Sequence, residues 1–260
     1  MKKYVLPLLL MIVACNKHDQ DCYPQRCHIT KLTNSDPLYG NYTAIFSYDA
    51  NGTPLRITRD RPITGSPNYI FRHDLHNRVT DVIGPYDAGN NGDVFEFWYR
   101  LKYDNRNRVI QDSSFYFGII GPNPENFEEH AYTIEVTTYT YDSQNRVIKT
   151  EEFQEGYAPD QHFYYYNNSG NLDSVVSKNG NDGSSYTTAY PHYDNKINFR
   201  RTNTLWQLLD RNYSVNNELN AVAYNRLGLP TRIEEYVSHY SRQSFLRFLL
   251  GNVDVEYSCK

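Results

Sequence analysis

Apolar and polar residues alternate along much of this chain. In residues 94–103, one set of alternate positions carries Phe95, Phe97, Tyr99, Leu101 and Tyr103. The other set includes Glu96, Arg100 and Lys102. Residues 42–48 repeat the pattern with Tyr42, Ala44, Phe46 and Tyr48. Successive side chains of a strand point to opposite faces, so both runs predict strands that bury one face.

Short polar segments recur between these runs, and residues 103–110 are the fullest copy. Copies begin at Tyr48, His73, Tyr103, Tyr141, Tyr166 and Tyr224, with a degenerate one at Tyr193. Their intervals are irregular, which favours hairpins of varying length over a solenoid of fixed period.

Each copy has the chemistry of a tight turn. An Asp or Asn follows the aromatic residue, and a Gly or Asn comes three positions later. The first side chain accepts backbone N–H groups, and the second residue tolerates a positive φ. This predicts three-residue hairpin loops. The turn pairs are Asp49 and Gly52, Asp74 and Asn77, Asp104 and Asn107, Asp142 and Asn145, Asn167 and Gly170, and Asn225 and Gly228.

The predicted fold is therefore all-β: a long, twisted and curled antiparallel sheet of hairpins with one or two short helices. Residues 202–213 have leucines at helical spacing and a cap at Thr202 or Asn203. Residues 241–250 are a second candidate helix. Loops are predicted at residues 60–67, 85–93, 121–129 and 179–185. Pro54 and Pro230 at the starts of outbound strands predict edge positions or exposed N–H groups.

The N-terminal segment has the pattern of a targeting signal. Lys2 and Lys3 precede an apolar run, residues 4–13, which is too short to span a membrane. With Cys15 it resembles the lipobox of bacterial lipoproteins, the alternative being an ordinary signal peptide with an incidental cysteine. The resemblance implies removal of residues 1–14, a lipid on Cys15 and a tether over 15–26. The hairpin pattern predicts one domain over 27–260. The expected location is the outer membrane, on its periplasmic or cell-surface face.

Three cysteines remain for disulfides in an oxidising compartment. A bridge between Cys27 and Cys259 would join the first strand to the last. In the chain-entropy model it would stabilise the folded state by on the order of 5 kcal/mol. Pairing of Cys22 with either of them, or no bridge, stays open because connectivity does not follow from sequence.

The copies at Tyr103 and Tyr141 share the core Tyr-Asp-x-x-Asn-Arg-Val. This core resembles the YD repeat of Rhs-type and toxin-shell proteins, which also occurs in short sets in Bacteroidetes-type surface lipoproteins. The resemblance covers roughly residues 45–235. It implies a hairpin scaffold, and it brings no catalytic residues with it.

Charge and composition narrow the function. The chain has 26 basic and 30 acidic residues, so no nucleic-acid partner is expected. It has 25 tyrosines, including Tyr139, Tyr141 and the run 164–166. Such rings form either the packed face of a sheet or an exposed stripe that stacks on sugars.

Candidate chemistry is sparse. Residues 87–93 lack the ligand pattern of a calcium loop. His73 and His76 have no neighbouring ligands, so we expect no metal and no cofactor. Adjacent carboxylates at 128–129 and 151–152 point to opposite strand faces. Three hypotheses follow: a non-enzymatic envelope lipoprotein acting as a scaffold or protein-interaction surface, a glycan-binding surface lipoprotein that uses exposed tyrosines, or an enzyme with catalytic groups gathered from distant strands.

Overall fold

The computed structural model describes residues 27–36, 40–126, 134–218, 220–236 and 251–260. It is nearly all β, and the predicted all-β antiparallel class is confirmed. The strands are β1 (Cys27–Asp36), β2 (Gly40–Tyr48), β3 (Pro54–Arg59), β4 (Tyr69–His73), β5 (Val79–Pro85), β6 (Val94–Tyr103), β7 (Val109–Ile120), β8 (Pro124–Asn126), β9 (Ile134–Tyr141), β10 (Val147–Gln154), β11 (Asp160–Tyr166), β12 (Leu172–Lys178), β13 (Ser185–Ala189), β14 (Ala221–Tyr224), β15 (Pro230–Tyr236) and β16 (Gly251–Cys259).

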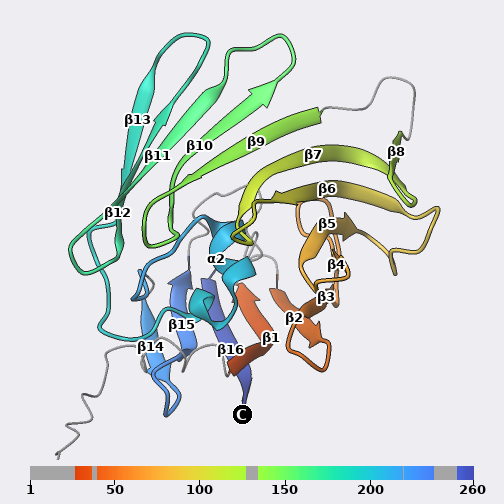
Figure 1. The fold of residues 1–260 in the computed structure, drawn as a ribbon. Coiled ribbons are helices and arrows are strands. Elements are labelled where there is room, and N and C mark those ends of the chain that lie inside the picture. The colour runs from red at the N-terminus through yellow and green to blue at the C-terminus, as the bar shows by residue number, and fades with distance from the viewer. Residues whose placement is uncertain (1–26, 37–39, 127–133, 219, 237–250) are drawn as a thin grey trace, which may run out of the picture.

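The strands form one 16-stranded sheet, in the order β13-β12-β11-β10-β9-β7-β6-β5-β4-β3-β2-β1-β16-β15-β14, with β8 paired only to β7. The sheet is open, and β13 and β14 are its edges. Figure 1 shows it curling around the short helix α2. Neighbours in sequence are mostly neighbours in the sheet, as expected for a chain of hairpins.

The break in this order is at β1, which pairs with β2 on one side and with β16 on the other. Cys27 lies opposite Cys259 in that register. Their sulfur atoms are 2.06 Å apart and form a disulfide, one of the pairings left open by the sequence. The first and last described strands therefore meet inside the sheet.

The third residue after each turn Asp or Asn has a left-handed backbone. Its φ is 61° at Asn77, 59° at Asn107, 61° at Asn145, 85° at Gly52, 82° at Gly170 and 79° at Gly228. In the copy at 104, the N–H of Asp104 donates to Arg108 O at 2.9 Å and that of Asn107 to Asp104 O at 3.2 Å. These bonds close the three-residue loop that the motif predicts.

A short helical insertion fills the inside of the curl. It comprises the 3-10 turn η2 (Phe199–Thr202) and α2 (Thr204–Asp210), shorter than the 202–213 helix that leucine spacing predicts. Asn203 caps α2 by accepting the N–H of Leu205 at 2.9 Å, and a left-handed Arg211 (φ 50°) ends it.

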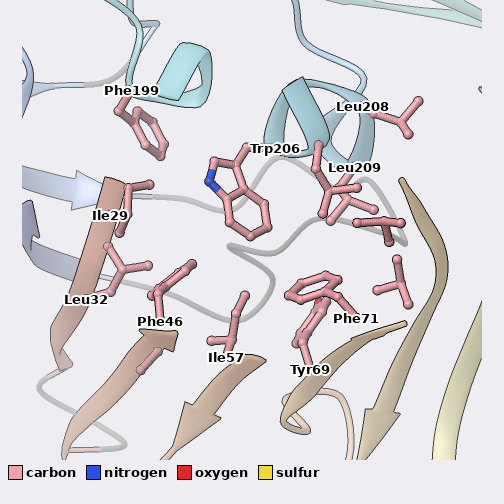
Figure 2. Packing of buried hydrophobic residues seen from close by; sticks show 14 of the residues in the cluster. Ile29, Leu32, Phe46, Ile57, Tyr69, Phe71, Phe199, Trp206, Leu208 and Leu209 are labelled. Atoms are coloured by element: carbon pink, nitrogen blue, oxygen red, sulfur yellow. The ribbon is translucent and has the colours of Figure 1, made fainter. Parts of the chain in front are cut away.

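The main hydrophobic core lies between α2 and the sheet. Trp206 is fully buried, with its ring centroid 5.7 Å from that of Phe46 and 5.8 Å from that of Phe71. Figure 2 shows Trp206 and Leu209 above the residues of β1 to β4. The insertion therefore covers the apolar face that a sheet of this length must bury.

Strand β6 departs from simple alternation. The pairing of β5 with β6 shifts between Gly84 and Pro85. Phe95 consequently packs with Trp98 in a second, smaller core, with ring centroids 5.5 Å apart, while Phe97 stays in the main core. Glu96, expected on the polar face, is buried and accepts the N–H of Gly65 at 2.6 Å.

Three further expectations are corrected or fall outside the described residues. Pro54 and Pro230 are the first residues of the interior strands β3 and β15, where no ladder N–H is required, so the edge-strand option is wrong. The predicted loop after residue 120 contains β8. Cys15, the tether, Cys22 and the candidate helix at 241–250 lie outside the described residues.

Candidate functional site

The turn carboxylates are held in place by the backbone. Asp104 Oδ1 accepts the N–H groups of Arg106 and Arg108 at 2.8 and 2.9 Å, and its Oδ2 accepts Arg108 Nε at 2.9 Å. The turns at Asp74 and Asp142 repeat this geometry. The backbone N–H of Arg78, followed by its side chain, lowers the pKa of Asp74 to about 2. An acid with so low a pKa holds no proton to donate near neutral pH.

Each of these arginines also covers a tyrosine ring of the next hairpin. The guanidinium carbon of Arg78 lies 4.8 Å from the ring centroid of Tyr103, and that of Arg108 lies 5.0 Å from that of Tyr141. The hydroxyl of Tyr103 donates to Val79 O at 2.7 Å. Burial raises the pKa of this hydroxyl to about 12. The motif thus links one hairpin to the next.

Four turns and the helix α2 enclose a groove of about 410 Å³, here called the turn groove. The turns contribute the side chains of Asn51, Asn77, Asn107 and Asn145. The facing wall includes Leu205 and Leu208 of α2 and also Tyr213. The remaining two turns lie elsewhere: a Cβ on Gly170 would meet Val215, and one on Gly228 would approach Lys196.

The turn groove combines amides with apolar side chains. Asn107 Oδ1 accepts Arg78 Nη1 at 3.3 Å, and Asn145 Oδ1 accepts Arg106 Nη2 at 3.2 Å. These contacts use the amide oxygens and orient the amide groups. An amide carries both a donor and an acceptor, so a row of them suits a ligand whose polar groups repeat.

A second hollow, here called the charged pocket, measures about 380 Å³. One wall is a single face of β11 to β13, with His162, Tyr164 and Tyr186 among its residues, and Tyr190 lines the pocket just after β13. The other wall belongs to residues 200–218 of the helical insertion and its exit, including Arg200, Arg211 and Glu218.

Ion pairs hold the charged groups of this pocket. Arg200 pairs with Asp210 through Nε and with Glu218 through Nη1, the latter at 2.7 Å. Arg211 Nη1 lies 2.6 Å from Glu152 Oε1. Burial alone would raise the pKa of Glu152, but the charge of Arg211 and the contact with His162 bring its pKa well below the usual range.

The pocket also places a serine, a histidine and a carboxylate in series. Ser177 Oγ is 2.8 Å from His162 Nδ1, and His162 Nε2 is 3.6 Å from Glu152 Oε1. The second distance is longer than a hydrogen bond, and Arg211 already pairs with that carboxylate oxygen. Ser177 lies in a strand paired on both sides, so its backbone N–H belongs to the sheet ladder. This arrangement suits binding better than nucleophilic catalysis.

The exposed tyrosines are scattered. Tyr157, Tyr165 and Tyr186 have exposed fractions of 61%, 52% and 66%. Tyr186 lines the charged pocket, whereas Tyr165 lies between Tyr164 and Tyr166 on the opposite face of β11. In the described residues, these three side chains therefore form no row along one groove.

Sequence reasoning did not find the charged pocket. Its charges come from β10, β11 and the helical insertion, which lie far apart in the chain. The one usable signal was the pair at 151–152: Glu151 contacts Lys149 at 2.9 Å, while Glu152 points to the pocket on the other face. Among the described residues, no group of His, Cys, Asp and Glu is placed to hold a metal, and no helix is long and apolar enough to cross a membrane.

Comparison with known proteins assigns this chain to no family. No family model and no curated protein matches this chain. Twenty-two chains of solved structures match. One belongs to a crystal structure of TcdB2-TccC3-TEV, a protein with Rhs/YD-repeat content, at 14% identity and a TM-score of 0.21. The match covers 76% of this chain and 12% of that one, and a TM-score this low supports no inference about fold or function.

Proposed function

We propose that this chain is a non-enzymatic cell-envelope lipoprotein whose sheet is a scaffold for a protein-interaction surface. In this proposal it belongs with the YD-repeat lipoproteins of Bacteroidetes type. A lipid on Cys15 attaches it to the outer membrane, with its domain on the periplasmic or cell-surface face. The observation that carries the interaction role is the turn groove. Three copies of the turn line it with an asparagine at the same left-handed position, and the fourth copy, which has Gly52 there, contributes Asn51 from the preceding position.

The spacing of these amides selects an extended polypeptide. Turns at one end of a sheet recur every second strand, which is about 9.6 Å. A polyproline II segment has three residues per turn and advances about 9.3 Å per turn. Its side chains and its unpaired backbone groups would therefore return to the same position at each hairpin. The leucines of α2 would pack against its apolar residues.

The tyrosines of the turn groove are less suited to sugars. The faces of Tyr103 and Tyr141 are covered by Arg78 and Arg108, and both hydroxyls donate to backbone carbonyls at 2.7 Å. A sugar ring stacks on an open aromatic face, and these rings already have a partner. A protein partner is therefore proposed ahead of a glycan.

Site-specific photo-cross-linking tests the proposal in intact cells. A photoreactive residue at position 107 lies in the turn groove, and one at position 165 lies on an exposed surface away from it. We expect discrete protein adducts from 107 that disappear when Thr204, an exposed residue of α2 at the groove, is also replaced by Glu, which puts a charge on the helix wall. Position 165 serves as the matched control.

Three results would count against this function. Equal adducts from both positions would show that the groove is not the interface. Adducts with polysaccharide in place of protein would favour the glycan-binding alternative. Covalent labelling of Ser177 by a fluorophosphonate would contradict the non-enzymatic part.

Lipidation is tested separately. Replacing Cys15 with Ala removes the thiol that would carry the lipid, so the protein should leave the membrane fraction and lose palmitate label. A Cys22→Ala variant, which keeps Cys15, should remain in the membrane. Continued labelling of the Cys15→Ala protein would refute the anchor.

A further inference from the structure

We propose that the charged pocket binds a small molecule carrying a protonated amine. This site is separate from the turn groove, so the inference goes beyond the proposed interaction surface. It rests on the charge, the rings and one unpaired oxygen of the pocket.

The charge of the pocket is negative. Its lining contains four carboxylates and two guanidinium groups, a formal balance of −2 with histidine neutral. Both guanidinium groups are buried in ion pairs, whereas Asp160 at the pocket has no ion-pair partner among the described residues. A cleft with an excess of one charge and low-dielectric walls concentrates ions of the opposite sign.

Aromatic rings complete the wall. Tyr164 and Tyr186 lie on the same face of β11 to β13, Tyr190 lines the pocket just after β13, and Tyr186 is 66% exposed. Aromatic faces attract cations, most strongly where water is excluded. Burial, with the negative charge of Glu218 next, raises the pKa of Tyr190 to about 12, so its ring is neutral at pH 7.

One buried acceptor has no partner. Glu218 has 4% of its side chain exposed and uses Oε1 to contact Arg200. Its Oε2 is buried without a hydrogen-bond partner among the described residues. Buried polar atoms are nearly always satisfied by protein, water or ligand. With a net negative charge around it, the donor that best completes this site is itself positively charged.

Amine sugars and polyamines share this chemistry and fit a hollow of about 380 Å³. The full-length protein, solubilised in detergent, is titrated at pH 7 by calorimetry with glucosamine, glucose, N-acetylglucosamine and spermidine. Glucose lacks the nitrogen, and N-acetylglucosamine keeps the nitrogen without its charge. We expect glucosamine to bind at least about tenfold more tightly than either neutral sugar, with affinity falling as salt is added. Tight spermidine binding would show that a protonated amine is sufficient for binding without a sugar ring. Tight glucosamine binding with weak spermidine binding would assign the site to amino sugars.

Two tyrosine variants localise the binding. Tyr186→Ala removes an exposed ring from the pocket and should weaken amine binding about tenfold without affecting folding. Tyr165→Ala removes a ring of similar exposure from the other face of the sheet and should leave affinity unchanged. Glu218→Gln keeps the shape of the side chain and removes its charge, so it should weaken amines while leaving neutral sugars unaffected.

The proposal is overturned by equal affinity for glucosamine and glucose, by absence of binding for every amine, or by equal effects of the two tyrosine variants.

Discussion

Two kinds of turn recur in this sheet, and they differ at their first, fourth and last positions. The turns at 74–78, 104–108 and 142–146 begin with Asp and end with Arg, whereas those at 167–171 and 225–229 begin with Asn. Both kinds have the same backbone bonds. Asp142 Oδ1 accepts the N–H groups of Gln144 and Arg146 at 2.9 Å, and Asn167 Oδ1 accepts those of Ser169 and Asn171 at 3.0 and 3.1 Å. One side-chain acceptor is therefore enough to shape the loop.

The difference lies in what each turn contacts next. Arg146 pairs with Asp142 and covers the ring of Tyr166 at 4.2 Å, so it connects its turn to the following hairpin. Asn171 instead donates to Asn216 Oδ1 at 3.1 Å, which connects its turn to the segment after the helical insertion. The Asp–Arg turns thus bind one another in a row, and the Asn turn at 167 anchors the distant segment.

Removing the acceptor from each kind of turn should give the largest contrast. Asp142→Ala loses two backbone bonds and leaves Arg146 unpaired, so we expect a loss of about 2 kcal/mol in the free energy of unfolding. Asn167→Ala loses only the backbone bonds, at about 1 kcal/mol. Urea unfolding at pH 7 measures both, and equal losses would mean that the arginine contributes nothing.

The left-handed position gives the next contrast. Asn107 has a φ of 59°, so Asn107→Val should cost about 1 kcal/mol or more, because a β-branched residue disfavours this backbone. Asn107→Gly should be neutral or mildly stabilising. Equal melting temperatures for these two variants would contradict a left-handed residue 107 in solution.

The tyrosine hydroxyls that join hairpins should contribute less. Tyr103→Phe removes the donor to Val79 O and should cost about 0.5–1 kcal/mol. Tyr165→Phe, on an exposed ring, is the matched control and should leave the melting temperature unchanged. A shift of the same size in both variants would show that the hydroxyl bond to the neighbouring hairpin is not what stabilises the row.

Lowering the pH should change the stability contribution of the Asp turns and leave that of the Asn turns unchanged, and this is the smallest effect that we expect. The folded pKa of Asp74 is lowered to about 2 from 3.8, so its contribution is complete above the unfolded value and is lost as the pH falls from about 4 to 2. The stability difference between the wild type and Asp74→Asn should shrink over this range. The difference for Asn167→Ala should stay constant, because Asn does not titrate. Parallel pH profiles for the two variants would argue against an ionised turn carboxylate.

The sheet could be predicted because its information is local. The Asp or Asn acceptor and the left-handed residue three positions later define each turn within five residues, and period-2 alternation defines the flanking strands. The pairing register between strands was harder to predict from the sequence. The shift beside Pro85 that turns Phe95 to the second core depends on pairing between strands, which alternation within one strand does not contain.

The candidate sites were harder still to predict. The sequence indicated that the polar groups of the motif serve the turn. That holds for the carboxylates, but the left-handed asparagines also line the turn groove. The charged pocket depends on the 200–218 segment meeting β10 to β13, a long-range contact that no local pattern reports.

The pairing of β1 with β16 has a consequence for how the chain is assembled. The hairpins formed by β2 to β13 can pair with the strands before them as soon as they are made, but β1 keeps one unpaired edge until residues 251–259 are made. Strand β15 depends on the same event, because β16 lies between it and β1. An unfilled slot in the middle of a sheet is a site for intermolecular pairing. Nascent chains should therefore be most prone to aggregation just before β16, which begins at Gly251, emerges. A carrier that holds the chain unfolded until β16 has emerged would protect it.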